Sequence, residues 1–419
     1  MVSREVYELV MDCAQRSKVA ARELATATEA AKNAALEKIA ESLLERQAEI
    51  LAANSVDMEN GKSKGLPSAL LDRLLLTPER ITAMAEGVRE IKAFPDPVGE
   101  ITELKPRPSG IKVGKMRVPL GVIGIIYEAR PNVTVDAAAL CLKAGNSVLL
   151  RGGSEAFNSN TKLAQILSEA LLAAGLSNDA IQLIPTTDRA SIQAMATMDD
   201  LVDVLIARGG ERLMAALAGA TVPLFKHGGG ICHTYIDIDA DLTKAVEIAF
   251  NAKVSRPGVC NAMETLLVHR GVAAQVLPEL GRKMQDAGVE LVGDDTVQQL
   301  VPGALAANED DWAAEYLSLK LAIRVVDSFA EAVEHIQRYS SLHSEAIVTE
   351  NYATAMRFLE QVDAAAVFVN ASTRFNDGGQ FGLGAEIGIS TQKLHARGPM
   401  GIKELTTTKF VVLGNGEVR

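Results

Sequence analysis

Hydrophobic positions recur with two different periods along this chain, and they separate helical stretches from strand-rich ones. Between residues 4 and 60, Ala, Leu, Ile and Val recur at helical spacing among Glu, Lys and Arg. This pattern predicts two or three long amphipathic helices. A further helix is expected to start at Pro78, with Thr77 as its N-cap. These helices carry no recognisable chemistry, so we interpret them as a packing layer.

The middle of the chain alternates short apolar runs with helical stretches. Buried strands are expected at 121–127, 147–150, 181–184, 202–206 and 222–225, and helices at 132–143, 154–174 and 211–218. We expect Ser154 to be the N-cap of its helix. Apolar strands that alternate with helices are typical of a doubly wound α/β domain, with a parallel sheet covered on both faces.

Ligands of such domains bind beyond the carboxyl ends of the strands, where unusual residues fill the loops 127–132, 151–154 and 207–212. In the second loop, Gly152 and Gly153 precede a helix, so backbone N–H groups are available to a phosphate. Arg151 adds a charge suited to an adenosine 2′-phosphate. The alternative is an ordinary glycine turn with a solvated arginine. The G-x-G-x-x-G fingerprint is absent from the sequence.

The same alternation begins again after Gly230, with strands expected at 234–238, 265–269, 289–292, 321–326, 346–349 and 365–370. We therefore predict a cofactor-binding α/β domain at 1–230 and a catalytic α/β domain at 231–404, followed by a β tail at 405–419. Residues 371–404 are Gly-rich and are expected to form a long loop over a cleft. The polar, Pro- and Gly-rich segment at 101–119 is predicted to form an exposed β-hairpin. It could pair with the tail or with a second subunit, so we expect a homo-oligomer.

One segment between an expected helix and strand stands out, because a turn places a thiol there. Pro257 fixes φ and Gly258 tolerates unusual backbone angles, so a tight turn precedes Cys260. Such a thiol can act as a nucleophile when a nearby cation, here Arg256, lowers its pKa. The alternative is that Cys260 is a small buried hydrophobe. The rest of the chain decides between these readings.

The other thiols point to packing. Cys13 and Cys141 lie at helical spacing among apolar residues, and Cys232-His233 reads as the start of a buried strand. No other Cys or His stands at ligand spacing beside that pair, so no metal site is expected.

Composition narrows the function classes further. A net charge of −11 argues against a nucleic-acid or anionic-membrane surface. Four widely spaced cysteines in 419 residues favour a reducing compartment. We see no signal peptide and no apolar run that approaches ~18 residues, so we expect a soluble cytoplasmic protein.

Four separated motifs occur in one order along the chain. They are PLGVIG at 119–124, YEARPN at 127–132, SRPGVC at 255–260, and the stretch 326–347 that contains AVEHI and YSSLHSE. Together they resemble the aldehyde dehydrogenase superfamily and, within it, the gamma-glutamyl phosphate reductase family. The resemblance covers nearly the whole chain, and its most specific stretch is 326–347, a pattern that ordinary aldehyde dehydrogenases lack.

The resemblance implies NADPH-dependent reduction of L-glutamyl 5-phosphate to L-glutamate 5-semialdehyde, in proline biosynthesis, through a thioacyl enzyme on Cys260. It implies that Asn132 supplies the oxyanion-hole amide, although the loop before it is longer here. Glu315 aligns with the carboxylate that holds the nicotinamide ribose. Arg151 replaces the usual ribose-binding Lys and suits NADP, and the loops that contact the cofactor's phosphates contain Ser154 and Gly209.

One departure from the superfamily is informative. Oxidising members carry a Glu before a Gly-Gly pair as the base that hydrolyses the thioester, and Lys226 takes that place here. Loss of the base protects a thioester meant for reduction, and a cation suits a phosphate leaving group. The candidates for gripping the substrate's phosphate and carboxylate are Arg130, Arg256, Lys226, His227 and His343.

Three rival readings remain: an oxidising aldehyde dehydrogenase, a dehydrogenase or acyl reductase for another carboxylic substrate, and a non-catalytic scaffold or regulatory module with the same fold. Lys226 counts against the first, and intact Cys260, Asn132 and Glu315 count against the third. Because the acyl phosphate is unstable, glutamate 5-kinase is a further expected partner, which would hand it over directly.

Overall fold

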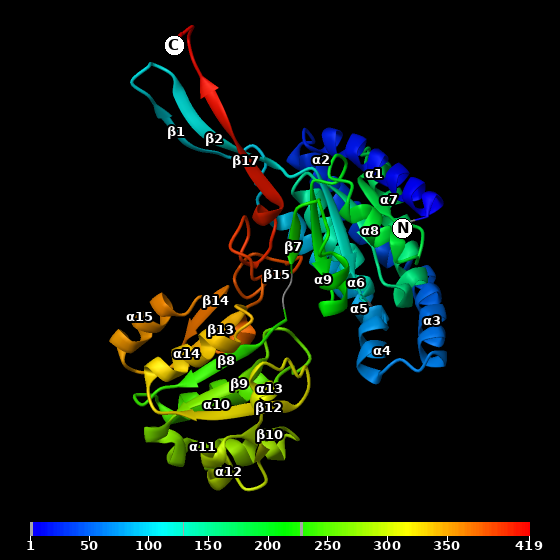
Figure 1. Ribbon diagram of the computed structural model, residues 1–419. Coiled ribbons are helices and arrows are strands. Elements are labelled where there is room, and N and C mark those ends of the chain that lie inside the picture. Colours follow the sequence, from blue (N-terminus) through cyan, green and yellow to red (C-terminus); the bar gives the residue numbers. More distant parts are fainter. Residues whose placement is uncertain (1–2, 129, 227–228) are drawn as a thin grey trace. The chain divides into compact units, whose positions relative to one another are not determined.

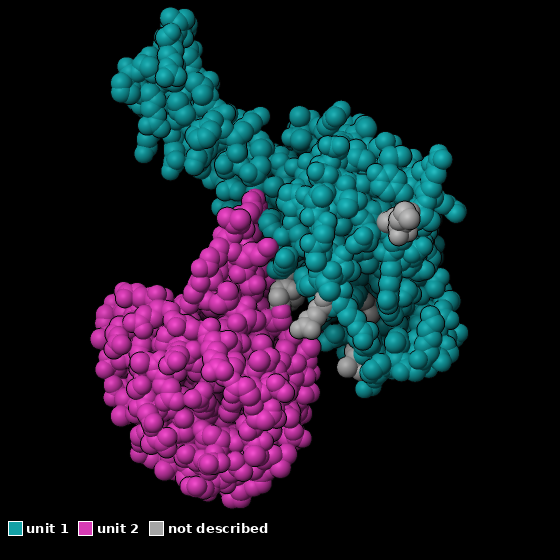
Figure 2. All heavy atoms as spheres, viewed as in Figure 1, with its two compact units in different colours: residues 1–227, 382–388, 400–419 teal, residues 228–381, 389–399 magenta. Residues whose placement is uncertain are grey.

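A computed structural model describes residues 3–128, 130–226 and 229–419. The chain forms two compact units, which Figure 2 shows in different colours. Each has its own sheet and hydrophobic core. The first comprises Met1–His227, Gly382–Gly388 and Met400–Arg419, and the second comprises Gly228–Phe381 and Ile389–Pro399. The chain therefore returns twice to the first unit after leaving it.

The first unit is built on a five-stranded parallel sheet in the order β5-β4-β3-β6-β7. Its strands are β3 (Val122–Tyr127), β4 (Ser147–Arg151), β5 (Ile181–Leu183), β6 (Val204–Arg208) and β7 (Leu224–Lys226). Every residue of β3 and β4 is buried, so helices cover both faces of the sheet. The predicted parallel α/β architecture is confirmed here.

Nine helices of this unit lie within the described residues, and they are labelled in Figure 1 where there is room. They are α1 (Arg4–Leu24), α2 (Glu29–Glu45), α3 (Gln47–Ser63), α4 (Ser68–Leu74), α5 (Pro78–Ala93), α6 (Pro131–Lys143), α7 (Phe157–Ala173), α8 (Ala190–Ala196) and α9 (Glu211–Ala216). The three long leading helices are as predicted. Thr77 caps α5 as expected, because its hydroxyl accepts the Arg80 N–H at 3.2 Å.

A three-stranded antiparallel sheet stands apart from the helices of the first unit (Figure 1). It contains β1 (Ile101–Pro106), β2 (Lys112–Pro119) and β17 (Thr406–Leu413), with β2 in the centre. The tail thus pairs with the hairpin of its own chain, one of the two expected alternatives. A short 3₁₀ turn (Lys403–Leu405) leads into β17.

The second unit carries a seven-stranded parallel sheet in the order β11-β10-β12-β9-β8-β13-β14. Its strands are β8 (Cys232–Ile236), β9 (Met263–His269), β10 (Glu290–Gly293), β11 (Leu305–Ala306), β12 (Lys320–Val326), β13 (Ser344–Val348) and β14 (Ala366–Val369). The helices are α10 (Leu242–Val254), α11 (Arg270–Asp286), α12 (Asp295–Leu300), α13 (Glu309–Trp312), α14 (Phe329–Tyr339) and α15 (Tyr352–Gln361). This is a second α/β layer structure, as the repeated pattern predicted.

The Gly-rich segment at 371–404 is mostly irregular. It contains a 3₁₀ turn at Thr373–Phe375 and a two-stranded ladder of β15 (Ile389–Ser390) with β16 (Gly398–Pro399).

The expected cap at Ser154 is wrong. Ser154 begins a 3₁₀ turn (Ser154–Ala156), and α7 starts after it. The carboxylate of the buried Asp57, from α3, instead accepts the N–H groups of Asn158 and Ser159 at 3.2 and 2.7 Å. A tertiary contact has thus replaced the local capping that the sequence suggested.

Candidate active site

Cys260 lies in a tight turn between α10 and β9, and its side chain is half-buried. The turn is closed by a hydrogen bond from the Ala262 N–H to the Val259 carbonyl at 3.1 Å. Asp241 caps the start of α10 by accepting the Lys244 N–H at 3.1 Å. The thiol is therefore placed by a fixed loop between a capped helix and a buried strand, as the Pro-Gly pair predicted.

The residues that lead into β8, Gly230 to Cys232, pack directly against this turn; we call them the floor of the turn. An ideal Cβ on Gly230 would lie 1.7 Å from the carbonyl oxygen of Cys260 and 2.6 Å from its Cα, so the two backbones are in direct contact. Two residues later, the Cys232 thiol donates to the same carbonyl at 3.2 Å. Only glycine permits an approach this close.

A second group of contacts holds the residue after the thiol. The Asn261 side-chain amide donates to the Asn376 carbonyl at 3.0 Å, and the Asn261 carbonyl accepts the Thr373 hydroxyl at 2.7 Å. The Arg374 guanidinium bonds Asn261 Oδ1 and donates from Nε to Ser255 Oγ at 3.2 Å. Residues 373–376 thus form a wall that fixes the turn from a distant part of the chain.

Positive charge gathers around the nucleophile turn. Burial lowers the pKa of Arg374, and the neighbouring Arg256 cation lowers it further. Arg256 is exposed, whereas Arg374 is half-buried and within electrostatic range of the Cys260 thiol. A cation beside a cysteine is the surrounding in which a nucleophilic thiol is generally found.

Glu315 reaches the same floor from the segment between α13 and β12. Its Oε1 accepts the Gly230 N–H at 2.6 Å, and an ideal Cβ on Gly229 would lie 3.0 Å from its Oε2. The family resemblance implies that Glu315 holds the nicotinamide ribose. In the second unit, Glu315 contacts Gly230, and Gly230 in turn contacts the backbone of Cys260.

The family-specific stretch around 340–345 lies behind β8 rather than at the surface. His343 is fully buried, with Nδ1 2.8 Å from Ser344 Oγ and 3.8 Å from Cys232 Sγ. Glu345, also fully buried, accepts the His233 N–H and contacts His233 Nδ1, both at 2.9 Å, and accepts the Ser340 hydroxyl at 2.5 Å. This stretch supports the strand on which the nucleophile turn rests.

The expected oxyanion residue belongs to the first unit. Asn132 is exposed in the first turn of α6, and its Nδ2 donates to Asp136 Oδ2 at 3.0 Å. Burial raises the pKa of Asp136 to about 6, although this bond opposes the rise. Arg130 is the N-cap residue of α6, and Lys226 is exposed at the end of β7. His227 lies outside the described residues.

Arg151 ends β4 and is almost fully buried. Its guanidinium donates to the carbonyls of Gly152 and Thr187 at 2.8 and 2.9 Å and to Ser191 Oγ at 3.3 Å. Burial lowers the pKa of Arg151, and this guanidinium braces the loops that follow β4 and β5. Most of its donors are therefore engaged with the protein itself.

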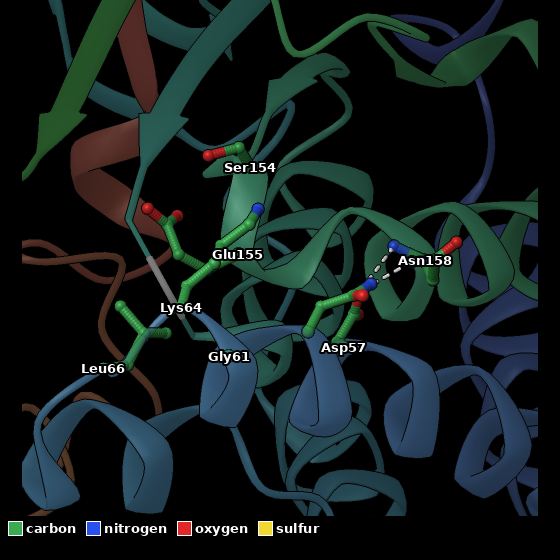
Figure 3. Close-up of a pocket in the computed structure, with 8 residues that line it drawn as sticks. Asp57, Gly61, Lys64, Leu66, Ser154, Glu155 and Asn158 are labelled. Carbon is green, nitrogen blue, oxygen red and sulfur yellow. Dashed lines mark hydrogen bonds between the residues drawn. The ribbon is translucent and has the colours of Figure 1, made fainter.

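A hollow of about 110 Å³ lies beside Ser154, between the end of α3 and the start of α7 (Figure 3). Lys64 and Glu155 also line it, and the Asp57 bonds to Asn158 lie along one side. Ser154 and Lys64 are both exposed, so a ligand at this edge would meet a hydroxyl and a cation.

The strand order of the first sheet reverses beside β3, which is the topology typical of dinucleotide-binding α/β domains. β3 lies between β4 and β6, so the chain order reverses there. The loops that leave the two strands on either side of the reversal touch, since the Glu128 N–H donates to the Arg208 carbonyl at 3.2 Å. Gly209 follows directly, and a Cβ there would lie 2.8 Å from Glu128 Oε1. Ligands of open parallel sheets bind at such reversals.

A family profile described as "Aldehyde dehydrogenase family" matches residues 2–316. The chain belongs to the aldehyde dehydrogenase family. It is 56% identical over 416 residues to a gamma-glutamyl phosphate reductase of Halothermothrix orenii, covering 99% of this chain and all of that protein. It is 58% identical over 406 residues to the enzyme of that name from Moorella thermoacetica, covering 97% of each.

Solved structures agree with this membership. The crystal structure of a gamma-glutamyl phosphate reductase from Thermotoga maritima superposes with a TM-score of 0.95 at 47% identity, covering 98% of this chain and 99% of that one. An acetylating aldehyde dehydrogenase from Geobacillus thermoglucosidasius has a TM-score of 0.72 at 18% identity over 99% of this chain and 98% of that one, and so shows the fold alone. The predicted aldehyde dehydrogenase fold is confirmed.

Neither the Gly230 segment nor residues 373–376, which hold the nucleophile turn, could be recognised from the sequence. Arg374 had no periodic or motif signal in the irregular segment that carries it. Gly230 stood in a visible Gly-Gly-Gly run, but nothing in the run indicated which glycine touches Cys260. Asp136 follows Asn132 by one helical turn, which is a signal that could have been used.

Among the residues that the structure describes, no helix is both long and apolar enough to cross a bilayer. All four cysteines are described, and none forms a disulfide. The described ranges contain no group of three or more His, Cys, Asp or Glu side chains placed to hold a metal ion.

Proposed function

We propose that this chain reduces L-glutamyl 5-phosphate to L-glutamate 5-semialdehyde and phosphate, with NADPH as the reductant, as a step of proline biosynthesis. The observation that carries the proposal is full-length similarity, at 56% identity, to a relative named gamma-glutamyl phosphate reductase. A half-buried thiol on a fixed turn beside two arginines supports it chemically.

Cys260 performs the covalent step. Its thiolate attacks the γ-carbonyl carbon, and the oxyanion receives hydrogen bonds from the Asn132 amide and from a backbone N–H. Collapse of this intermediate expels phosphate and leaves a thioacyl enzyme. The nicotinamide cofactor, when bound, supplies the hydride that reduces the thioester. The resulting thiohemiacetal then collapses, which releases the semialdehyde and regenerates the Cys260 thiolate.

The residues of the first unit fit a nicotinamide dinucleotide. The reversal of strand order beside β3, the glycine loops after β4 and β6, and the exposed hydroxyl of Ser154 suit a pyrophosphate and its flanking riboses. In the second unit, Glu315 suits ribose hydroxyls, since a carboxylate accepts hydrogen bonds from them.

We assign the preference for NADPH to positive charge in the first unit. Arg151 keeps its charge while bracing the loops, and Arg189 is exposed within electrostatic range of it. Lys64 adds a cation at the hollow beside Ser154 (Figure 3). These charges complement an adenosine 2′-phosphate and give a 2′-hydroxyl no comparable advantage.

Exposed cations are proposed to grip the substrate's phosphate and carboxylate. Arg256 and Lys226 are exposed and Arg130 is partly so, whereas His343 lies fully buried against Cys232. We therefore assign substrate contact to Arg256, Lys226 and Arg130, and place His343 in support of β8. His227 is retained as a candidate from the sequence alone.

We also propose a homo-oligomer, a cytoplasmic location and a handover of the acyl phosphate from glutamate 5-kinase. β17 is an edge strand with Phe410 71% exposed, which suits burial against a second copy. Co-sedimentation with the kinase tests the handover, and independent migration of the two proteins would contradict it.

The reaction run backwards tests the function directly. Protein, glutamate semialdehyde and NADP are mixed, and reduced cofactor is followed with and without inorganic phosphate. We expect phosphate-dependent reduction that is lost in Cys260→Ala. Reduction without phosphate would mean that water resolves the thioester, and the chain would then be an oxidising dehydrogenase. The absence of reduction under both conditions would leave another acyl substrate or a scaffold.

A further inference from the structure

A buried pair of opposite charges spans the nucleophile turn. Lys253 is in the last turn of α10 and Glu264 is the second residue of β9, so they flank the loop that carries Cys260. Lys253 Nζ lies 2.5 Å from Glu264 Oε2, and neither side chain is exposed at all. The proposed chemistry of the thiol makes no use of either residue.

The same carboxylate holds the segment that carries Glu315. Glu264 Oε1 accepts the Leu317 N–H at 3.1 Å, and Leu317 has a φ of 52°, a strained value for a residue with a side chain. The Tyr316 ring lies 5.8 Å from Lys253 Nζ. One ion pair thus joins both ends of the Cys260 loop to the residues just after Glu315.

Stability alone does not account for this arrangement. Taking two charges out of water costs more than their attraction usually returns, and apolar pairs of similar volume are often at least as stable. The cost shows in both groups, because burial raises the pKa of Glu264 to about 7 and lowers that of Lys253. An apolar pair would fill the space but would leave the Leu317 N–H without its acceptor.

We propose that Lys253 and Glu264 are positioning residues, which set the Cys260 loop and the Glu315 segment in register with each other for hydride transfer to the thioester. The proposal rests on the reductase function proposed above. A displacement of about 1 Å at a reacting group can cost ~10²-fold in rate. An ion pair that fixes these two segments relative to each other can therefore affect the reaction rate strongly.

The test replaces the pair with apolar residues in the full-length protein. Lys253→Met/Glu264→Leu is compared with a control, Lys32→Met/Asp96→Leu, which removes another buried ion pair (2.6 Å apart) from the helical layer of the first unit. Melting temperature, kcat, KM and the rate of Cys260 alkylation by iodoacetamide are measured. Alkylation requires neither substrate nor cofactor.

We expect the Lys253→Met/Glu264→Leu protein to fold with a somewhat lower melting temperature than the parent, because the Leu317 N–H loses its acceptor. It should lose kcat by about tenfold or more with KM unchanged, and its alkylation rate should change. The control should keep the parent's kcat and alkylation rate. Parental kcat and alkylation in the Lys253→Met/Glu264→Leu protein would overturn the proposal, as would equal losses in the control.

If that double variant fails to fold, Lys253→Met/Glu264→Gln decides by the same readouts, because the Gln keeps the acceptor for Leu317 and no charge is left buried without its partner. A parent protein that shows no phosphate-dependent reduction would refute the proposed function instead. The alkylation comparison would still decide the positioning role.

Discussion

Replacing Gly230 by alanine is the sharpest test of how the nucleophile is held. The added Cβ would sit 1.7 Å from the Cys260 carbonyl oxygen and 2.4 Å from its carbonyl carbon. Ordinary contacts begin at 3.4 Å, so one of the two backbones must move by about 1.7 Å. Neither partner is a flexible side chain that can rotate away.

This displacement sets the expected magnitude. Because a 1 Å misplacement of a reacting group can cost ~10²-fold, Gly230→Ala should lower kcat by about 100-fold or more. Overpacking of this kind also costs about 1–3 kcal/mol of folding free energy, so the protein should still fold. Phosphate-dependent reduction of NADP by the semialdehyde measures kcat, and iodoacetamide alkylation reports the thiol's position.

Gly229→Ala is the matched control, since its Cβ meets only the end of the Glu315 side chain, at 3.0 Å. A carboxylate can shift by the few tenths of an ångström that this contact requires. We expect a much smaller loss of kcat than in Gly230→Ala and a native alkylation rate. Equal kcat and equal alkylation rates in the parent and Gly230→Ala would refute the reasoning that the floor positions Cys260.

Three further perturbations test other parts of the structure. Glu345→Ala removes the acceptor of the buried His233 N–H and of the half-buried Ser340 hydroxyl, and it should lower the free energy of unfolding by about 3–5 kcal/mol in urea titrations; a loss near zero would contradict this. Asp136→Ala frees the Asn132 amide and should lower kcat by about tenfold with KM retained, whereas an unchanged kcat would argue against the oxyanion role. Burial lowers the pKa of His335 from 6.5 to about 2, so below pH 6.5 the unfolded chain binds a proton there that the folded protein does not. The contribution of His335 to stability is therefore complete above pH 6.5 and is lost as pH falls. Stability should drop by about 2 kcal/mol between pH 6.5 and 4.5 from this group, and a His335→Phe protein with the parent's pH profile would refute that.

Much of the fold follows from local pattern. The apolar run expected at 121–127 is β3 (Val122–Tyr127), because a continuous apolar run of that length suits a strand buried on both faces. The short helix α12 (Asp295–Leu300) was missed, since six residues give too little periodicity to stand out. Its cap, Asp294, accepts the Val297 N–H at 3.0 Å, but an Asp alone is a weak signal.

In the candidate site, too, local features could be predicted from the sequence and tertiary contacts could not. The turn at Cys260 was foreseeable because Pro257 and Gly258 act on their own backbone. The contacts that fix it were not, because Thr373 and Arg374 reach Asn261 across more than a hundred residues. Ser154 failed as a cap for the same reason: Asp57 outcompetes it from another helix.

Many of the contacts that hold the nucleophile turn do not depend on the protonation state of a side chain. The contacts that hold the Cys260 turn include a glycine backbone, main-chain carbonyls and neutral amides, which keep their form across the working pH range. Charged groups also take part: Arg374 hydrogen-bonds Asn261 and Ser255 and lies within electrostatic range of the thiol, while Lys253 and Glu264 pair across the two ends of the loop. A thioester that must await a hydride rather than water needs its carbonyl held still, and rigid neutral contacts do this without offering a base. The predicted replacement of the superfamily's hydrolytic Glu by Lys226 would follow the same logic, since it too would remove a base that activates water.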